Sequence, residues 1–436
     1  MARAALLVGL LSVPLGYIAT TYGPGIARGV TVLGITRTPV AGVYESVVTL
    51  EETGVCEDLA YHADSGLIFT ACEQSLESRL SWFPPLVHFD TAGVDKSEGA
   101  LFVIDPKTRT AERVNIVHYK GPFITHGIDV VTDTEWDKDD GSSAVYIIAI
   151  NHLPNPHYLS ALAKGASTAG IPKARSQIEV LHYIIGSSIA RHMRSVWDPA
   201  VVTPNDVVAV GGSPNELLVT NDHFHREGRL RSVEELWFGA AWTSTVYLRT
   251  VPGKEVGGVT ASVATEKLHN NNGIGHGRPG TSEIAITSCA SGRLRLGNVV
   301  KASSSSSSSS SSAKVVNFTE VVEFDSVIDN PSYFSDPYGD LSGWILPGLS
   351  RAVDLKKTFG DPAGVDPSIV WYARKDTRTG EWVKKVLFED DGSRIRSASG
   401  AVLVAIDPKE EGGKRKGWLY VTGFVSSHVI VVKVDL

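Results

Sequence analysis

The 436-residue sequence predicts an all-β fold, and the spacing of its polar motifs predicts a six-bladed β-propeller. Beyond residue 45, short apolar segments alternate with Gly, Pro, Asn and Asp. Short strands separated by turn residues at close intervals are typical of β-sandwiches, barrels and propellers. Examples of such segments are GLIFTAC from Gly66, GALFVIDP from Gly99, AVYIIAINH from Ala144, NELLVTNDH from Asn215, EIAITSC from Glu283 and GWLYVTGF from Gly417.

Polar residues that precede or open apolar segments recur along the chain. Examples are Glu57-Asp58 in CEDLAYH, His126 in THGIDVV, Asn205-Asp206 in TPNDVVAVGG, Asn272 in NNNGIGHG and Asp329-Asn330 in VIDNPSYF. The intervals between residues 57, 126, 205, 272 and 329 are 69, 79, 67 and 57, and one more step of 69 reaches Ala398. Each interval fits a four-stranded blade with insertions, repeated six times. In a propeller, equivalent positions of successive blades meet near one end of a central channel.

These motifs would bring oxygen atoms together in that channel. The side chains are the carboxylates of Glu57, Asp58, Asp206 and Asp329 and the amides of Asn205, Asn272 and Asn330. Carboxylate and amide oxygens without thiolate favour a hard cation, and Ca²⁺ accepts about six to eight such ligands. Because neighbouring residues on a strand point in opposite directions, one pair can serve two ions stacked along the channel. The alternative is that these residues are unrelated turn residues or strand caps.

Two further segments and the overall composition complete the prediction of fold and class. Residues 230–242 (LRSVEELWFGAAW) are the only stretch with a helical pattern, and the pure serine run 303–312 predicts a disordered surface insertion between strands. A net charge of −7 gives no reason to expect nucleic acid as a partner. The three cysteines allow at most one disulfide, and their spacing matches no zinc pattern.

The N-terminus predicts a membrane or secretory location. No charged residue lies between Arg3 and Arg28, and this apolar stretch is typical of a signal h-region or a short membrane span. No clear small-residue cleavage site follows, which favours an uncleaved signal anchor over a cleaved signal peptide. We therefore expect the remaining chain in the secretory pathway, anchored to the endoplasmic reticulum or the cell surface, or secreted. The Asn317-Phe318-Thr319 sequon is compatible with glycosylation there.

From about Gly54 to Leu436 the chain resembles the serum paraoxonase/arylesterase family, six-bladed propellers with two calcium ions in the central tunnel. The resemblance is carried, in order, by ED at Glu57-Asp58, HGI at 126–128, NH at Asn151-His152, PNDVVAVG at 204–211 with TNDH at 220–223, NGI at 272–274 and DN at Asp329-Asn330. The apolar N-terminus is similar to the retained signal sequence of that family. The expected organisation is a signal-anchor or transmembrane-like segment over residues 1–27 and one propeller hydrolase domain over residues 28–436.

Carried over residue by residue, the resemblance implies two calcium sites and a histidine dyad. The catalytic calcium ion would be held by Glu57, Asn205, Asn272, Asp329 and Asn330. The deeper, structural ion would be held by Asp58, Asp206 and the main-chain carbonyl of Ile128. His126 and His152 match the proposed dyad of the family, in which one imidazole takes a proton from water and the other holds its tautomer. His223, after a strand in TNDHF, is more consistent with a supporting or structural role.

The function implied is calcium-dependent hydrolysis of small-molecule lactones or aryl esters. A calcium ion with an open coordination position can polarise an ester or phosphoryl oxygen and stabilise the oxyanion. No G-x-S-x-G motif is present, so the sequence lacks the usual motif of a serine-nucleophile hydrolase. Two other readings stay open: a membrane-anchored calcium-binding propeller without catalysis, and a strictosidine-synthase-like propeller, which would not need the acid and amide pairs. The family's animal members tie their first and last strands with a disulfide, but no cysteine follows Cys289, so closure must rely on strand pairing.

Overall fold

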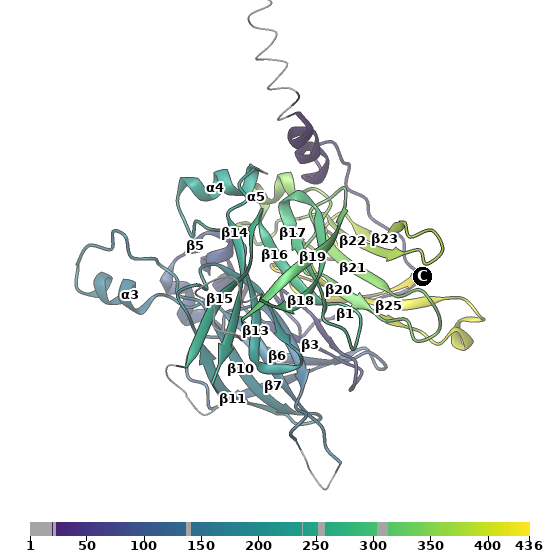
Figure 1. Ribbon diagram of the computed structural model, residues 1–436, viewed down its shortest axis with the longest axis horizontal. Helices are drawn as coiled ribbons and strands as arrows, with labels where there is room; N and C mark the ends of the chain where they lie inside the picture. Colours follow the sequence, from purple (N-terminus) through teal and green to yellow (C-terminus); the bar gives the residue numbers. More distant parts are fainter. Residues whose placement is uncertain (1–19, 21–22, 137–140, 238, 252–257, 303–312) are drawn as a thin grey trace, which may run out of the picture.

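The structure is a computed structural model that describes residues 20, 23–136, 141–237, 239–251, 258–302 and 313–436. Most of it consists of groups of four neighbouring antiparallel strands, which we call runs. The arrangement of the sheets is all-β and propeller-like (Figure 1). The first three runs are β2 (Ala60–His62), β3 (Leu67–Cys72), β6 (Ala100–Asp105) and β7 (Thr110–Val117); β8 (Thr125–Thr132), β9 (Ala144–Asn151), β10 (Gln177–Ile184) and β11 (Ile189–Val196); and β12 (Pro204–Val210), β13 (Ser213–Asn221), β14 (Thr243–Thr250) and β15 (Val259–Leu268).

The remaining runs follow the same order along the chain. They are β16 (Asn271–His276), β17 (Glu283–Ser288), β18 (Arg293–Lys301) and β19 (Lys314–Glu323); β20 (Ser332–Phe334), β21 (Gly343–Leu349), β22 (Ser368–Lys375) and β23 (Trp382–Asp390); and β24 (Ala398–Ala405), β25 (Lys416–Gly423) and β26 (Val429–Asp435), completed by β1 (Val47–Leu50). All six strand segments named from the sequence are strands here. The repeat positions fall at or just before the first strand of each run.

One pairing departs from a simple series of separate sheets. The outer strands β7 and β11 pair in parallel over residues 115–117 and 189–191, so the first two runs form one eight-stranded sheet. Four further sheets of the described residues have four strands each, and β4 (Trp82–Phe83) pairs with β5 (His88–Phe89) in a separate two-stranded sheet. This parallel contact joins the last strands of two consecutive runs. It is a tertiary contact, so the local sequence of either strand does not predict it.

The core is distributed between neighbouring runs. The first strands β8, β12, β20 and β24 each serve two core clusters, because successive side chains of a strand point to opposite faces. In β12, Val207 packs with residues of β8 to β11, whereas Val208 packs with residues of β16 and β17. Corresponding clusters join the fourth run to the fifth, the fifth to the last, and the last to the first. Packing therefore continues from run to run and returns to the first one.

Strand pairing between the two ends of the chain completes the last sheet. The N-terminal strand β1 pairs antiparallel with β26, with Val47 opposite Val432 and Leu50 opposite Val429. This observation agrees with the expectation that closure does not use a disulfide between the first and last strands.

The expectation of a single helix is wrong. The structure contains α2 (Leu76–Ser81), α3 (Pro156–Ala163), α4 (Arg229–Leu236) and α5 (Leu355–Thr358), besides a helix over residues 23–32. The predicted helix is α4, which ends at Leu236 because Trp237 is extended. The six residues of α2 are too few to show a helical period. The local signals of α2 and α3 are their capping residues, Ser75 and Asn155.

The helix over residues 23–32 docks on the propeller-like body. Arg28 Nη2 donates to the carbonyl of Phe324 at 2.8 Å, and Arg28 Nε donates to that of Ser291 at 3.2 Å. Val32 is fully buried against Val327. Within the part of the chain that the structure describes, no helix has the length and apolar character needed to cross a membrane. Residues 1–19 and the serine run 303–312 lie outside the described residues.

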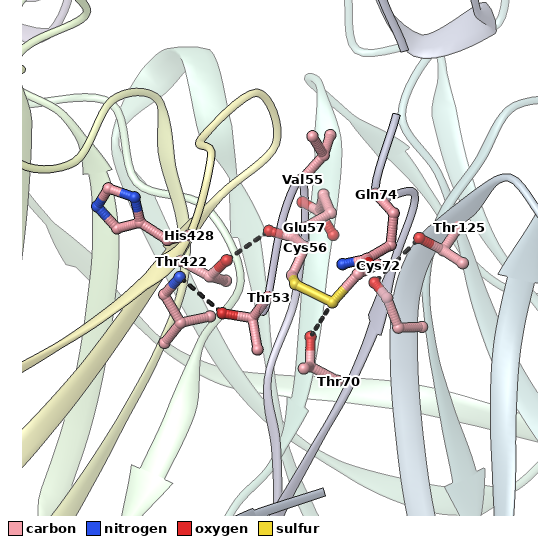
Figure 2. Close-up of a disulfide and its surroundings, with 12 residues drawn as sticks. Thr53, Val55, Cys56, Glu57, Thr70, Cys72, Gln74, Thr125, Thr422 and His428 are labelled. Atoms are coloured by element: carbon pink, nitrogen blue, oxygen red, sulfur yellow. Dashed lines mark hydrogen bonds between the residues drawn. A yellow bond between two sulfur atoms is a disulfide. The ribbon is translucent and has the colours of Figure 1, made fainter. Parts of the chain in front are cut away.

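A disulfide joins Cys56 to Cys72 at a sequence separation of 16 (Figure 2). Cys56 directly precedes Glu57 and Asp58, and Cys72 ends β3. The main-chain carbonyl of Cys56 also accepts a hydrogen bond from Thr422 Oγ1 at 2.5 Å. The disulfide thus links the Glu57-Asp58 segment to β3 of its own sheet, and the hydrogen bond from Thr422 links it to β25.

Replacing both cysteines by serine should lower the free energy of unfolding by about 3 kcal/mol, because a loop of this length is then free in the unfolded chain. The measurement is urea unfolding of the wild type with and without reductant, beside the Cys56→Ser/Cys72→Ser variant. The matched control is Cys289→Ser, which removes the free thiol and should leave the effect of reductant unchanged. Equal midpoints for the wild type and the double variant would contradict the prediction.

Candidate active site

The starts of the first strands bring the sequence-predicted residues together. Strand β8 contacts both β2 and β12, β12 contacts β16, and β20 contacts both β16 and β24. All ten predicted site residues are at most 9% exposed, so they lie inside the body and not on its surface. They are Glu57, Asp58, His126, Ile128, His152, Asn205, Asp206, Asn272, Asp329 and Asn330.

Two glycines allow the first strands to approach each other closely. A Cβ atom at Gly127 would lie 2.2 Å from Asp206 Oδ1, and a Cβ at Gly273 would lie 2.6 Å from Asn330 Oδ1. No other residue fits such gaps without movement of the neighbouring strand. The glycines of the HGI and NGI motifs therefore keep room for the polar side chains of the next strand.

Glu57 lies among buried polar side chains that come from other runs. Asn330 Nδ2 donates to both of its carboxylate oxygens, at 3.0 and 3.1 Å. His126 Nε2 lies 3.7 Å from Glu57 Oε1 and 3.5 Å from Asn205 Nδ2. Glu57, His126, Asn205 and Asn330, from four different runs, are thus linked by direct contacts.

Four buried oxygens in this group have no hydrogen-bond partner in the described structure. They are Asn205 Oδ1, Asn272 Oδ1, Asp329 Oδ1 and Asn330 Oδ1. A buried polar atom without a partner is costly, so these oxygens are suited to accept a cation or a proton donor. No three His, Cys, Asp or Glu side chains of the described ranges form a metal cluster by themselves. A cation would therefore need the amide oxygens, and a mixed carboxylate and amide set fits Ca²⁺.

Asp58 and Asp206 have similar hydrogen-bond partners, and these partners differ from those of the residues that precede them, Glu57 and Asn205. Each aspartate accepts the N–H of the next residue and an N–H of the following run. Asp58 accepts from Ile128 N at 3.3 Å, and Asp206 accepts from Ile274 N at 2.7 Å. Asn205, the neighbour of Asp206, instead faces His126. The adjacent residues 205 and 206 therefore point to different surroundings, as period-two alternation predicts.

The crowding of acidic groups changes their acidity. Burial raises the pKa of Glu57 well above its usual value, and the charges of Asp329, Asp58 and Asp206 raise it further. Burial likewise raises the pKa of Asp58 to about 7. Buried carboxylates of this kind are stabilised in the charged form by a nearby cation.

The two predicted histidines form a hydrogen-bonded pair. His126 Nδ1 lies 2.9 Å from His152 Nε2, and His152 Nδ1 lies 2.7 Å from Ser176 Oγ. Burial, reinforced by the positive charge of Arg79, lowers the pKa of His126 to about 3. Burial also lowers the pKa of His152 well below its usual value, so both rings are neutral at pH 7. If His126 Nδ1–H donates to His152 and His152 Nδ1–H donates to Ser176, the free lone pair of His126 Nε2 faces Glu57.

A segment that the sequence motifs do not identify covers the histidine pair. It consists of α2, β4 (Trp82–Phe83), the turn over residues 84–87 and β5 (His88–Phe89). Trp82 Nε1 donates to the carbonyl of His152 at 2.8 Å. The ring of Phe83 lies edge-on to both histidines, with centroid distances of 5.2 and 5.5 Å. The cover lies beside α4, because Arg231 donates to the carbonyl of Pro85 at 2.6 Å.

His223 lies in a separate buried cluster. Its Nδ1 atom is 3.0 Å from Asp222 Oδ1, and its Nε2 atom is 3.4 Å from Glu235 Oε1 on α4. Asp222 also acts electrostatically on both histidines of the pair. A supporting role for His223 stays a prediction.

Comparison with known proteins gives a distant relationship. No family model matches the chain. The chain is 28% identical over 162 residues to serum paraoxonase/arylesterase 2 of Gallus gallus. The aligned region covers 36% of this chain and 38% of that protein, well under half of either. The similarity supports a paraoxonase-like relationship.

Solved structures of low sequence identity also align with the fold. A protein of unknown function from Dyadobacter fermentans DSM 18053 aligns over 90% of this chain and 99% of its own, with 12% identity and a TM-score of 0.43. A functionally unknown protein from Desulfotomaculum acetoxidans DSM 771 aligns over 86% and 85%, with 7% identity and a TM-score of 0.35.

Proposed function

We propose that this chain is a calcium-dependent hydrolase of lactones or aryl esters, built as a six-bladed propeller in which the eight-stranded sheet counts as two blades. The observation that carries the proposal is the set of four unpartnered buried oxygens beside Glu57 and the histidine pair. The distant similarity to serum paraoxonase/arylesterase 2 supports the same reaction class.

Two calcium ions fit the residues present. Glu57, Asn205, Asn272, Asp329 and Asn330 would hold the ion that faces the substrate. Asp58, Asp206 and the carbonyl of Ile128 would hold a second one, because each carboxylate oxygen has a lone pair beyond the N–H bond that it accepts. When bound, the first ion would polarise the substrate carbonyl and make water more acidic.

His126 would act as the general base. Its neutral ring has an acceptor atom, Nε2, on the side of Glu57 and Asn205. After it takes a proton from water, the resulting imidazolium lies 3.7 Å from the Glu57 carboxylate, which stabilises the charge. His152 would hold the tautomer through its bond to His126 and is itself fixed by Ser176. His126 and His152 are at most 3% exposed, so the cover would keep bulk water from the pair and strengthen these interactions.

The proposed location of the protein is based on its N-terminal sequence. We propose a membrane anchor or signal within residues 1–27 and the hydrolase domain in residues 28–436, on the secretory side. Asn317 of the sequon is exposed on the edge strand β19, where an oligosaccharide would have room. Carbonate extraction should leave the full chain with the membrane pellet, and its release into the supernatant would contradict an anchor.

The central experiment measures turnover and metal content of the same preparation. Hydrolysis of phenyl acetate and of a γ- or δ-lactone should occur with calcium and disappear after treatment with EDTA. Added calcium should restore it, and the purified protein should contain about two calcium ions per chain, as the two ligand sets require. Bound calcium without turnover of any ester would point to a non-catalytic scaffold, and less than one bound ion would overturn the calcium sites altogether.

A further inference from the structure

Arg79 is a fully buried arginine in α2, on the segment that covers the histidine pair. Its Nη2 atom donates to the carbonyls of Thr125 at 3.1 Å and Val55 at 3.4 Å. Its Nε and Nη1 atoms have no hydrogen-bond partner. The unused N–H groups are the majority of the guanidinium donors. Burial of donors of this strength without acceptors is costly.

No carboxylate among the described residues forms an ion pair with Arg79. The charges of Glu73 and Glu57 act on it from a distance, while burial lowers its pKa to about 10, so the side chain is positive at neutral pH. Glu73 is buried too, and its Oε1 atom also lacks a partner. Burial raises the pKa of Glu73 to about 7, which weakens its ability to balance the arginine.

The position of Arg79 relates it to the reacting groups. Its guanidinium carbon lies 3.9 Å from the ring centroid of Phe83, whose edge contacts both His126 and His152. Arg79 also lowers the pKa of both histidines through its charge. A partner for the unused donors would therefore lie near Phe83 and the histidine pair of the proposed active site.

We propose that Arg79 binds an anionic group of the substrate, so that the preferred substrates are esters or lactones that carry a carboxylate. The proposal rests on the proposed hydrolase function for its choice of substrate. Guanidinium and carboxylate form charge-assisted hydrogen bonds, which are about twice as strong as neutral ones. His126 is only 3% exposed, so the cover must open for the substrate to reach the site, and Arg79 moves with it. Closure would then bring the cation to the bound anion.

The test compares 4-carboxyphenyl acetate with the neutral 4-carbamoylphenyl acetate in the wild type and in Arg79→Met. The kcat/KM ratio of the anionic to the neutral ester should fall about 10- to 100-fold in the variant. Taking the ratio removes differences in intrinsic reactivity between the two esters. Arg79→Lys should recover part of the ratio, because it keeps the charge without the planar fork. The matched control is Arg109→Met, which removes an arginine stacked 4.6 Å from Trp418 and should leave the ratio unchanged.

A binding measurement separates this inference from the hydrolase proposal. Calorimetric titration with benzoate should give a dissociation constant about 10-fold or more below that for benzamide in the wild type, with the difference lost in Arg79→Met. If no ester is hydrolysed, this titration alone decides the role of Arg79. If Arg79→Met does not fold by circular dichroism, the wild type and Arg79→Lys decide it. Equal binding of benzoate and benzamide by the wild type, or an unchanged kcat/KM ratio in the folded variant, would overturn the proposal.

Discussion

Asp206→Ala should lower the melting temperature in calcium far more than Asn205→Ala, although the two residues are neighbours. Asp206→Ala would remove a charged side chain that coordinates the deeper ion. An ion that binds only the folded state stabilises it by about 4 kcal/mol when its concentration is about 1,000 times its dissociation constant. Asn205→Ala would lose a neutral ligand of the ion that faces the substrate, so activity should fall while the fold persists. The measurement is melting temperature against free calcium for the wild type and both variants.

Asp206 also accepts hydrogen bonds from Val207 and Ile274, and their loss alone would destabilise the fold. The two causes differ in their dependence on calcium. If the ion is responsible, the gap between the wild type and Asp206→Ala should be large in calcium and small in EDTA. A gap of the same size under both conditions would assign Asp206 a purely structural role. Identical curves for the two variants would mean that residues 205 and 206 share one site or none.

His126→Gln should reduce lactone turnover by about 10²- to 10⁴-fold, the contribution expected of a general base. Calcium content should stay the same, because His126 belongs to neither ligand set. His152→Gln should have a smaller effect, about 10- to 100-fold, since His152 acts through the orientation of His126. The control is His157→Gln at an exposed position of α3. Unaltered turnover in His126→Gln would remove this residue from the mechanism.

Much of the fold could be predicted because its signals are local and repeated. The alternation of Val207 and Val208 between two core clusters follows from the period of a strand. The glycines at 127 and 273 lie in motifs of the sequence, and the structure shows the close approach that requires them. The different surroundings of Asn205 and Asp206 follow from the same alternation.

The features that could not be predicted depend on contacts between distant segments. Arg79 and Phe83 lie in a short insertion without a repeat, and only the folded chain brings them to His126 and His152. Three cysteines allow three pairings, and the sequence contains nothing that selects Cys56 and Cys72. The parallel pairing of β7 and β11 is likewise a tertiary contact between strands that are individually unremarkable in sequence.

The pairing of β1 with β26 has a consequence for how the protein is made. Val47 emerges from the ribosome long before Val432 is added to the chain. Strand β1 therefore has no β26 to pair with while the intervening strands are synthesised. During that time an unpaired strand edge is available to other chains, which is an aggregation hazard. Final folding of this sheet therefore follows the synthesis of β26, and a nascent chain that stops short of β26 would be a substrate for chaperones or degradation.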